Sequence, residues 1–427
     1  MKKNKNEISD DGVVELNGEE KRRDLRSGGV ELDIYDDGEE QINEYYVKIS
    51  YGIRFFKFLT LTVLVVFVLC MLTAFSDDIT AENFQYLMKD LNIELPDSPS
   101  QFGHIAYTED AEQSFEMFKS DLVSVGRQSV EVVNMAGEPV LKSDISYVKP
   151  RISAGKSYFL VYDMSGYDFS VYNSFSVLYS ETLDYPISDA YMADDGRFAI
   201  VTRSDDYRCC VIIYNKSYKP AYTWKTNDKY VFDVILNTDG SFEILAASAE
   251  NGSMQSYCIS GNIRQEQINT VQYGEDIMGL DMHMFENGKK VVFCTDRIVF
   301  TDENGPVASE HKYGLDECII TYACDKYAAA VFDKAKLGED TALCIFDQEG
   351  KLLQTFDIEP HPIDVYIYGE YAYVLYDDNI TRISLKDGKR GAYANKSVIV
   401  RLLQTENGIL LAAGKNRAYP IEENEFI

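Results

Sequence analysis

The chain has 427 residues, of which 45% are hydrophobic and 26% charged, and its formal net charge is -29. This length allows either two or three ordinary domains or one large repeat domain with a sizeable core. So acidic a surface repels phosphate backbones and anionic lipid headgroups, which argues against nucleic-acid binding and against a soluble domain lying flat on a membrane.

The N-terminal segment, residues 1–54, is predicted to be a disordered acidic tail, because charge runs and glycine pairs dominate it and aromatic residues are few. Two short stretches in the tail, 12–16 and 29–34, have similar sequences with alternating apolar and acidic residues. Extended segments of this kind can add a strand to the sheet edge of a partner, here a cytosolic one. Chance similarity in a low-complexity tail is the alternative explanation.

A continuous apolar run, residues 58–75, follows the tail and contains no charged residue. At about 1.5 Å per residue a helix of this length spans roughly 27 Å, close to the ~30 Å hydrocarbon core of a bilayer. A buried core helix would show a polar side, and this run shows none. The sequence therefore predicts one transmembrane helix over residues 55–76.

The charges beside this run predict its orientation. Lys48, Arg54 and Lys57 precede the run closely, whereas Asp77 and Asp78 follow it. The positive-inside rule then places the N-terminus in the cytosol and the C-terminal part outside, as a single-pass protein of the cell membrane. A cleaved signal peptide is the alternative, but its leader would exceed the usual ~15–30 residues by far.

Residues 77–102 are expected to form a short stalk helix and a linker. Apolar residues recur there at helical spacing (Phe84, Leu87, Met88 and Leu91), and Pro96 ends the pattern. The linker that follows, 96–100, is rich in proline and serine and is expected to be a stiff spacer.

The remaining chain, residues 103–427, is predicted to be all-β. Strand-like runs alternate with turns rich in Asp, Asn and Gly, and Asn-Gly or Asp-Gly pairs supply the positive φ that tight hairpins need. Groups of four strands recur, and their first strands begin near Tyr147, Ile187, Val231, Ile277, Cys318, Ile363 and Val398. Residues 103–146 supply one more set of strands.

A period of about 40–45 residues with four strands per unit is typical of β-propeller blades. The pattern predicts seven or eight blades, and the even division of residues 103–427 favours eight. Because a single blade cannot bury its own faces, the ring must close, and the two ends of the domain are expected to meet in or beside one blade. A β-sandwich is the alternative fold, but it does not explain the repeated four-strand period.

The repeat resembles WD40-like and quinoprotein-like bacterial propellers in its period and strand order. It lacks the Gly-His and Trp-Asp signatures of WD40 repeats, Trp224 is the one tryptophan, and the Trp-bearing docking motif of quinoproteins is absent. The arrangement of acidic tail, single helix, stalk and propeller resembles a bacterial family of membrane-anchored propeller proteins with a domain of unknown function. That resemblance implies a fold and a location and no activity.

Eight cysteines occur, and Cys70 lies in the apolar run. The other seven cannot all pair within one chain, and no Cys-x-x-C spacing suggests zinc or redox chemistry. Most of them lie in strand-like runs, where cysteine behaves as a small buried hydrophobe. One or two disulfides are the alternative, because an extracytoplasmic compartment permits them.

No catalytic, cofactor or metal-binding residue can be assigned from the sequence. Gly155-Lys156-Ser157 resembles the end of a phosphate-binding loop, but the chain around it is typical of a hairpin. The histidines, His104, His283, His311 and His361, share no metal-ligand spacing. His361 lies between two prolines at a blade junction, on the face where ligand loops are expected. The pairs Asp194-Asp195, Asp205-Asp206 and Asp377-Asp378 match no calcium loop and are explained by turn formation.

These observations favour a non-enzymatic binding or scaffold module, an extracytoplasmic propeller that engages a protein or a cell-envelope ligand. A sensor subunit with the tail as its cytosolic output is the first alternative. The second is a hydrolase or lyase acting on envelope polymers, since propeller sites can assemble carboxylates from distant loops.

Overall fold

The computed structural model describes residues 44–74, 103–250, 252–302, 305–334, 340–395, 397–405 and 408–426. The chain divides into two compact units, Met1–Ile93 and Glu94–Ile427. Both similar segments of the expected tail, the stalk helix and the linker up to residue 102 lie outside the described residues.

The described residues of the first unit form helix α1 (Glu44–Ala74). Its segment Ile49–Cys70 is long and apolar enough to cross a membrane, and large apolar side chains are exposed along it. The hydroxyls of Thr60 and Thr62 donate to the carbonyl oxygens of Phe56 and Phe58 at 2.8 and 2.9 Å, so their polar groups are satisfied within the helix, as hydrocarbon requires. The helix fits a single-pass anchor. It begins before residue 55, the bound expected for the membrane segment.

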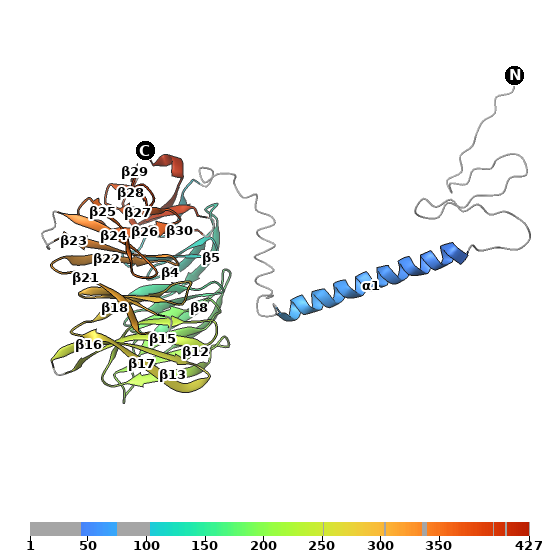
Figure 1. Ribbon diagram of the computed structural model, residues 1–427, viewed down its shortest axis with the longest axis horizontal. Coiled ribbons are helices and arrows are strands. Elements are labelled where there is room, and N and C mark those ends of the chain that lie inside the picture. The colour runs from blue at the N-terminus through green and yellow to red at the C-terminus, as the bar shows by residue number, and fades with distance from the viewer. Residues whose placement is uncertain are drawn as a thin grey trace, which may run out of the picture. The chain divides into compact units, whose positions relative to one another are not determined.

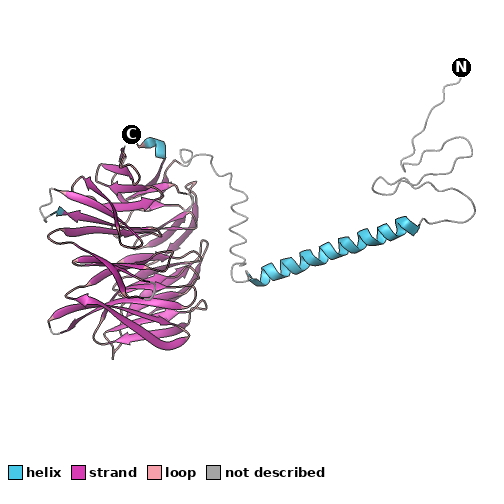
Figure 2. Ribbon diagram, viewed as in Figure 1, coloured by secondary structure: helices cyan, strands magenta, loops and turns pink. Residues whose placement is uncertain are grey.

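The second unit is an eight-bladed β-propeller, and almost all the regular secondary structure in its described part is strand (Figure 2). The prediction of seven or eight blades is confirmed, with eight. Each blade is a four-stranded antiparallel sheet, and in blades 1 to 7 the strands follow one another in chain order from the innermost to the outermost.

The first four blades have the following bounds. Blade 1 consists of β2 (Ser114–Phe118), β3 (Asp121–Val125), β4 (Ser129–Val133) and β5 (Pro139–Asp144); blade 2 of β6 (Pro150–Ala154), β7 (Phe159–Asp163), β8 (Asp168–Tyr172) and β9 (Val177–Thr182); blade 3 of β10 (Asp189–Met192), β11 (Phe198–Thr202), β12 (Cys209–Tyr214) and β13 (Pro220–Thr226); and blade 4 of β14 (Tyr230–Leu236), β15 (Ser241–Glu250), β16 (Ser253–Asn262) and β17 (Gln265–Glu275).

The other four blades continue in the same order. Blade 5 consists of β18 (Gly279–Met284), β19 (Lys290–Cys294), β20 (Arg297–Thr301) and β21 (Val307–Lys312); blade 6 of β22 (Glu317–Ala323), β23 (Tyr327–Asp333), β24 (Thr341–Asp347) and β25 (Leu352–Ile358); blade 7 of β26 (Asp364–Tyr368), β27 (Tyr371–Leu375), β28 (Asn379–Ser384) and β29 (Arg390–Ala394); and blade 8 of β30 (Ile399–Gln404), β31 (Leu410–Gly414), β32 (Arg417–Ile421) and β1 (Ile105–Ala106). A short 3₁₀ turn, η3 (Glu423–Glu425), follows β32.

Blade 8 closes the ring by combining both ends of the domain, as the sequence predicts. The N-terminal strand β1 is its outermost strand and pairs antiparallel with β32, Ile105 opposite Ala418 and Ala106 opposite Arg417. Figure 1 shows the red C-terminal blade beside the teal first blade. Ile105 is fully buried in a cluster that joins blade 8 to blade 1 through Leu122 and Leu411. Both strand pairing and the burial of apolar side chains therefore stabilise the closure of the ring.

The core is divided among the interfaces between blades. Eight apolar clusters occur in the described residues, and each joins two neighbouring blades around the ring. Between blades 1 and 2, for example, the Phe159 ring lies 5.1 Å from those of both Phe118 and Tyr172. The interior strands carry the alternating apolar residues that fill both sides of a blade, so burial needs the neighbouring blade.

The turns behave as their residues predict. Gly196 and Gly240, which end the Asp-Asp-Gly and Thr-Asp-Gly turns, have φ of 90° and 95°. These values lie in the region that glycine occupies without steric cost. The turns let first and second strands of blades 3 and 4 pair tightly.

None of the eight cysteines forms a disulfide, so no disulfide joins the blades. Five of them are buried, Cys209, Cys210, Cys258, Cys294 and Cys344, in agreement with their interpretation as small apolar side chains.

Candidate functional site

One face of the ring is defined by the beginnings of the innermost strands. Each blade has four antiparallel strands, so its outermost strand ends on the same face where the next innermost strand begins. We call it the first-strand face. It carries the connections between blades and those between the second and third strands of each blade.

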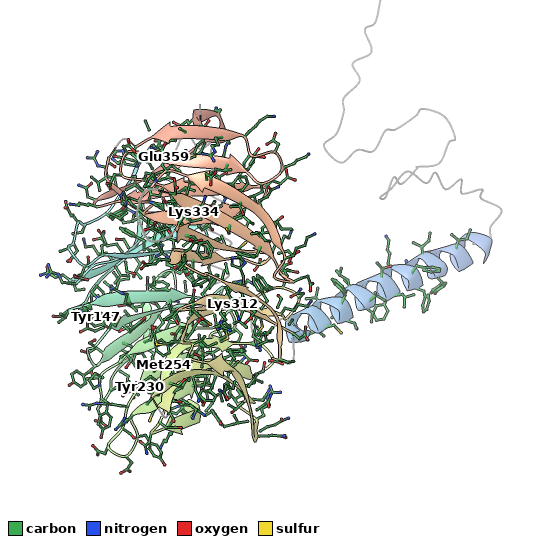
Figure 3. All side chains as sticks on the ribbon, turned by 60° about the vertical axis from the view of Figure 1, so that its left-hand side comes forward. Tyr147, Tyr230, Met254, Lys312, Lys334 and Glu359 are labelled. Atoms are coloured by element: carbon green, nitrogen blue, oxygen red, sulfur yellow. The ribbon has the colours of Figure 1, made fainter. Side chains whose placement is uncertain are left out.

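Large apolar side chains are exposed on the first-strand face in most blades. Leu315, in the connection before β22, is 82% exposed, and Val148, before β6, is 70% exposed. The full set, which we call the apolar set, is Val148, Tyr167, Tyr207, Tyr230, Met254, Leu280, Leu315, Ile319, Ile363, Val398 and Val400. Figure 3 labels two of its members in blade 4, Tyr230 and Met254. Fewer large apolar side chains are exposed elsewhere in the described propeller.

Repeated β-bulges contribute three members of the apolar set. The pairing of first with second strands skips one residue in blades 5, 6 and 8, at Leu280, Ile319 and Val400. A bulge leaves the extra residue outside the ladder and changes the direction of its side chain. All three side chains are more than two-fifths exposed beside the channel. The same bulge occurs in blade 4 at Phe232, which is only partly exposed.

The described loops of the first-strand face are predominantly acidic. Their exposed carboxylates are Glu109, Glu112, Asp184, Asp205, Asp206, Asp228, Asp276, Asp296, Asp340, Glu359, Asp377 and Asp378, whereas their exposed cations are Arg127, Lys149, Arg203, Arg208 and Lys415. The apolar set therefore lies among loops that attract positive charge.

Two aspartates near the beginnings of innermost strands, Asp233 and Asp364, join these strands to one another. Asp233 and Asp364 each accept a hydrogen bond from the following amide of their own strand, at 2.7 and 2.9 Å. Each also accepts one from the next blade, Asp233 from the amide of Met282 at 2.9 Å and Asp364 from that of Leu402 at 3.4 Å. These carboxyls hold neighbouring blades in register around the channel.

Asp233 is buried, and its carboxyl is hydrogen-bonded to that of Asp281 in the next blade. Burial, and then the negative charge of Asp281, raise the pKa of Asp233 to about 8. Asp233 therefore holds a proton at neutral pH.

A cavity of about 230 Å³ lies in the channel between blades 1, 6, 7 and 8. Its polar lining includes Glu116 from β2, Asp364 from β26 and Arg401 from β30. Burial raises the pKa of both carboxyls, and the positive charge of Arg401 partly offsets that effect. The rings of Tyr322 and Tyr366, 5.1 Å apart, also line the cavity.

The four histidines considered in the sequence analysis do not come together in one site. His361 has a φ of 60° and is exposed in the connection between β25 and β26, on the first-strand face. His104 is exposed beside Tyr419. His283 and His311 are partly buried against aromatic rings, and burial lowers the pKa of each. Within the described ranges no group of three or more His, Cys, Asp or Glu side chains is arranged to hold a metal ion.

The other sequence candidates lie in turns. Gly155-Lys156-Ser157 connects β6 to β7, where Lys156 pairs with Asp194 at 2.8 Å and the Ser157 hydroxyl donates to the Asp194 carbonyl at 3.0 Å. Asp195 receives the guanidinium of Arg197 at 2.9 Å. Asp205-Asp206 and Asp377-Asp378 lie in loops on the first-strand face.

The channel residues and the apolar set were not identified from the sequence. A usable signal exists: an apolar residue followed by Asp recurs at Phe232-Asp233, Leu280-Asp281 and Ile363-Asp364. This pair of residues marks the beginning of an innermost strand. Its apolar residue lies in a bulge or in the preceding loop, and its aspartate lies in the strand.

Comparisons with known proteins agree with this architecture. A model of a family of unknown function, DUF5711, matches residues 102–417. The structure of BamB from Moraxella catarrhalis is similar with a TM-score of 0.50 and 10% identity, over 74% of this chain and 100% of that chain. A eukaryotic initiation factor is similar with a TM-score of 0.50 and 11% identity, over 75% of this chain and 89% of that chain. Likeness at this identity shows the fold alone. A search of curated proteins finds no match.

Proposed function

This chain belongs to the DUF5711 family of unknown function, and we propose that it is a membrane-anchored, extracytoplasmic binding module that engages a protein through its first-strand face. The observation that carries the proposal is the apolar set, with members in blades 2 to 8 and several around the channel. Exposed apolar side chains gathered on one face of a soluble domain are typical of interaction sites.

The acidic loops define the kind of partner. A polypeptide segment that carries both apolar and basic side chains would complement this face. Its apolar side chains would cover the apolar set, and its Lys or Arg side chains would pair with the acidic loops. An acidic or purely polar segment would meet repulsion or leave the apolar set uncovered. We therefore favour a cationic, apolar segment of an envelope or membrane protein as the occupant.

The anchor gives the module its place. Helix α1 contains a segment that can cross a membrane, and the basic residues at its N-terminal end, Lys48, Arg54 and Lys57, favour an N-terminus in the cytosol and a propeller outside. Tethering at a membrane raises the effective concentration of a partner in the same bilayer, so even weak face contacts can give stable association.

A defined peptide tests the face. Full-length protein in nonionic detergent is titrated with a short labelled Leu/Lys peptide, and with Leu/Glu and Ser/Lys counterparts, while fluorescence anisotropy is recorded. The Leu/Lys peptide should bind best. Replacing Val148, Leu280 and Leu315 together by Ser should weaken its binding at least about tenfold, because three apolar contacts are lost.

A matched variant controls for general effects. Val177, Val307 and Leu352 are exposed at the beginnings of outermost strands, on the opposite face, and their joint replacement by Ser should leave binding unchanged. Equal weakening by both triple variants, or equal binding of the Leu/Lys and Leu/Glu peptides, would refute the proposed docking face.

A further inference from the structure

The channel cavity contains charged groups of both signs that are not paired directly. Arg401 pairs with Ala413 through the β30–β31 ladder, but its guanidinium makes no hydrogen bond and no ion pair of 4 Å or less in the described part of the chain. Its positive charge still lowers the pKa of Glu116 and Asp364. Its side chain is exposed, although it lines the cavity. The guanidinium is therefore available to a ligand.

Glu116 is the available carboxylate. Both oxygens of Asp364 accept backbone amides, from Val365 and Leu402. Within the described residues, the Glu116 carboxylate accepts one hydrogen bond, from the amide of its neighbour Met117 at a long 3.3 Å. A partly buried carboxylate with so little hydrogen bonding is stabilised by an incoming cation.

A third polar group lines the same cavity. Gln404 is 9% exposed, and its amide nitrogen donates to the carbonyl oxygen of Gly408 at 2.9 Å. Its Oε1 has no hydrogen-bond partner among the described residues. Buried polar atoms without partners are uncommon in folded proteins, and an acceptor beside a cavity is suited to a ligand N–H.

From these groups we propose that the channel cavity binds a small zwitterion of the α-amino acid class, with its ammonium toward Glu116 and Gln404 and its carboxylate toward Arg401. Arg401 repels a simple cation, and the two carboxyls repel a simple anion. A zwitterion finds a group of opposite charge for both its ammonium and its carboxylate. Tyr322 and Tyr366 supply an aromatic wall for its side chain.

The size of the cavity limits the ligand. Its volume of about 230 Å³ is below the ~300–1,000 Å³ of sites for drug-sized molecules. It corresponds to roughly seven or eight waters, taking ~30 Å³ for each. A single amino acid is of this scale, and a nucleotide or peptide is larger. The inference is independent of the docking proposal, because none of the lining residues belongs to the apolar set.

Calorimetric titration of the full-length protein in nonionic detergent tests this site with the standard L-α-amino acids, one at a time. At least one should bind. For that amino acid, the amine without its carboxylate and the N-acetyl derivative without its ammonium should each bind about 10- to 100-fold more weakly, since each loses one charge-assisted pair. These probes use the unaltered protein and do not depend on the folding of a variant.

Substitutions then locate the site. Glu116→Gln and Arg401→Gln should each weaken binding by a similar factor. Glu359→Gln and Arg264→Gln alter exposed groups away from the cavity and should not. Absence of binding by every amino acid up to ~10 mM, or equal affinity in both channel variants and the unaltered protein, would overturn the proposal.

Discussion

Replacing Asp233 by Asn is expected to remove a specific pH dependence of stability. Asp233 is buried, accepts amides from Val234 and Met282, and shares hydrogen bonding with Asp281. Its pKa rises from 3.8 to about 8 on folding. The folded chain therefore binds more protons than the unfolded chain between these values. The resulting stabilisation is fully present below pH ~4 and is lost as pH rises through ~8.

The expected size follows from the shift. Between pH ~5 and ~9 a carboxyl with these two pKa values loses about 4 kcal/mol of stabilisation, because most of its proton is released in that interval. Asn cannot ionise, so Asp233→Asn lacks this loss. At pH ~5 the variant should be less stable by about 1–3 kcal/mol, since an amide offers one acceptor to two backbone N–H groups.

Urea unfolding at several pH values, followed by circular dichroism, measures this effect. The stability difference between the unaltered chain and Asp233→Asn should change sign between pH ~5 and ~9, because the expected loss of about 4 kcal/mol exceeds the initial deficit of the variant. Taking the difference cancels other titrating groups. Asp378→Asn, on an exposed loop, should retain the pH dependence of the unaltered chain. A difference between Asp233→Asn and the unaltered chain that stays constant with pH would refute the assignment of a protonated Asp233.

Three further predictions concern burial. Lys290 is 1% exposed and pairs with Glu243 at 2.9 Å between blades 4 and 5, so Lys290→Met should cost about 3–5 kcal/mol by stranding a buried carboxylate. Urea midpoints measure the cost, and recovery in a double variant with Glu243→Leu is expected; a single-variant cost below ~1 kcal/mol would argue against an ionised pair. Ile105→Ala, at the ring closure, should cost about 2–4 kcal/mol in the same assay, whereas Ala106→Ser on the exposed side of β1 should cost little. Maleimide should label Cys258 in the folded chain far more slowly than after denaturation, since burial raises its pKa from 9.0 to about 12 and lowers the thiolate fraction about a thousandfold; comparable rates would contradict that burial.

Much of the fold follows from sequence periodicity. The innermost strands were expected to begin near Tyr147, Ile187 and Ile277, and they begin at Pro150, Asp189 and Gly279. The named residues are themselves buried at blade interfaces, so the apolar signal came from the connection just before each strand. The four-strand period predicted seven or eight blades, with eight favoured by the even division of residues 103–427, and the structure has eight.

The candidate sites were less accessible to sequence reasoning. Glu116, Asp364 and Arg401 come from three blades, and only ring closure brings blade 8 beside blade 1. Side-chain direction in a strand alternates by residue, and one bulge reverses it. The burial of Lys290 could not be predicted either, because the sequence Gly288-Lys289-Lys290 is typical of an exposed turn. Its partner Glu243 lies 47 residues earlier in the chain, in the neighbouring blade.

The closing strand has a mechanical consequence for an anchored protein. Along the chain, any tension applied through helix α1 would reach the propeller first at β1, which has two residues. Those residues resist by pairing with β32 and by the burial of Ile105. A sufficient pull would detach this strand before any other, uncover the third strand of blade 8 and open the ring where blades 8 and 1 meet. The load limit of the whole module is therefore expected to be the strength of that short attachment, and not the average strength of its blades.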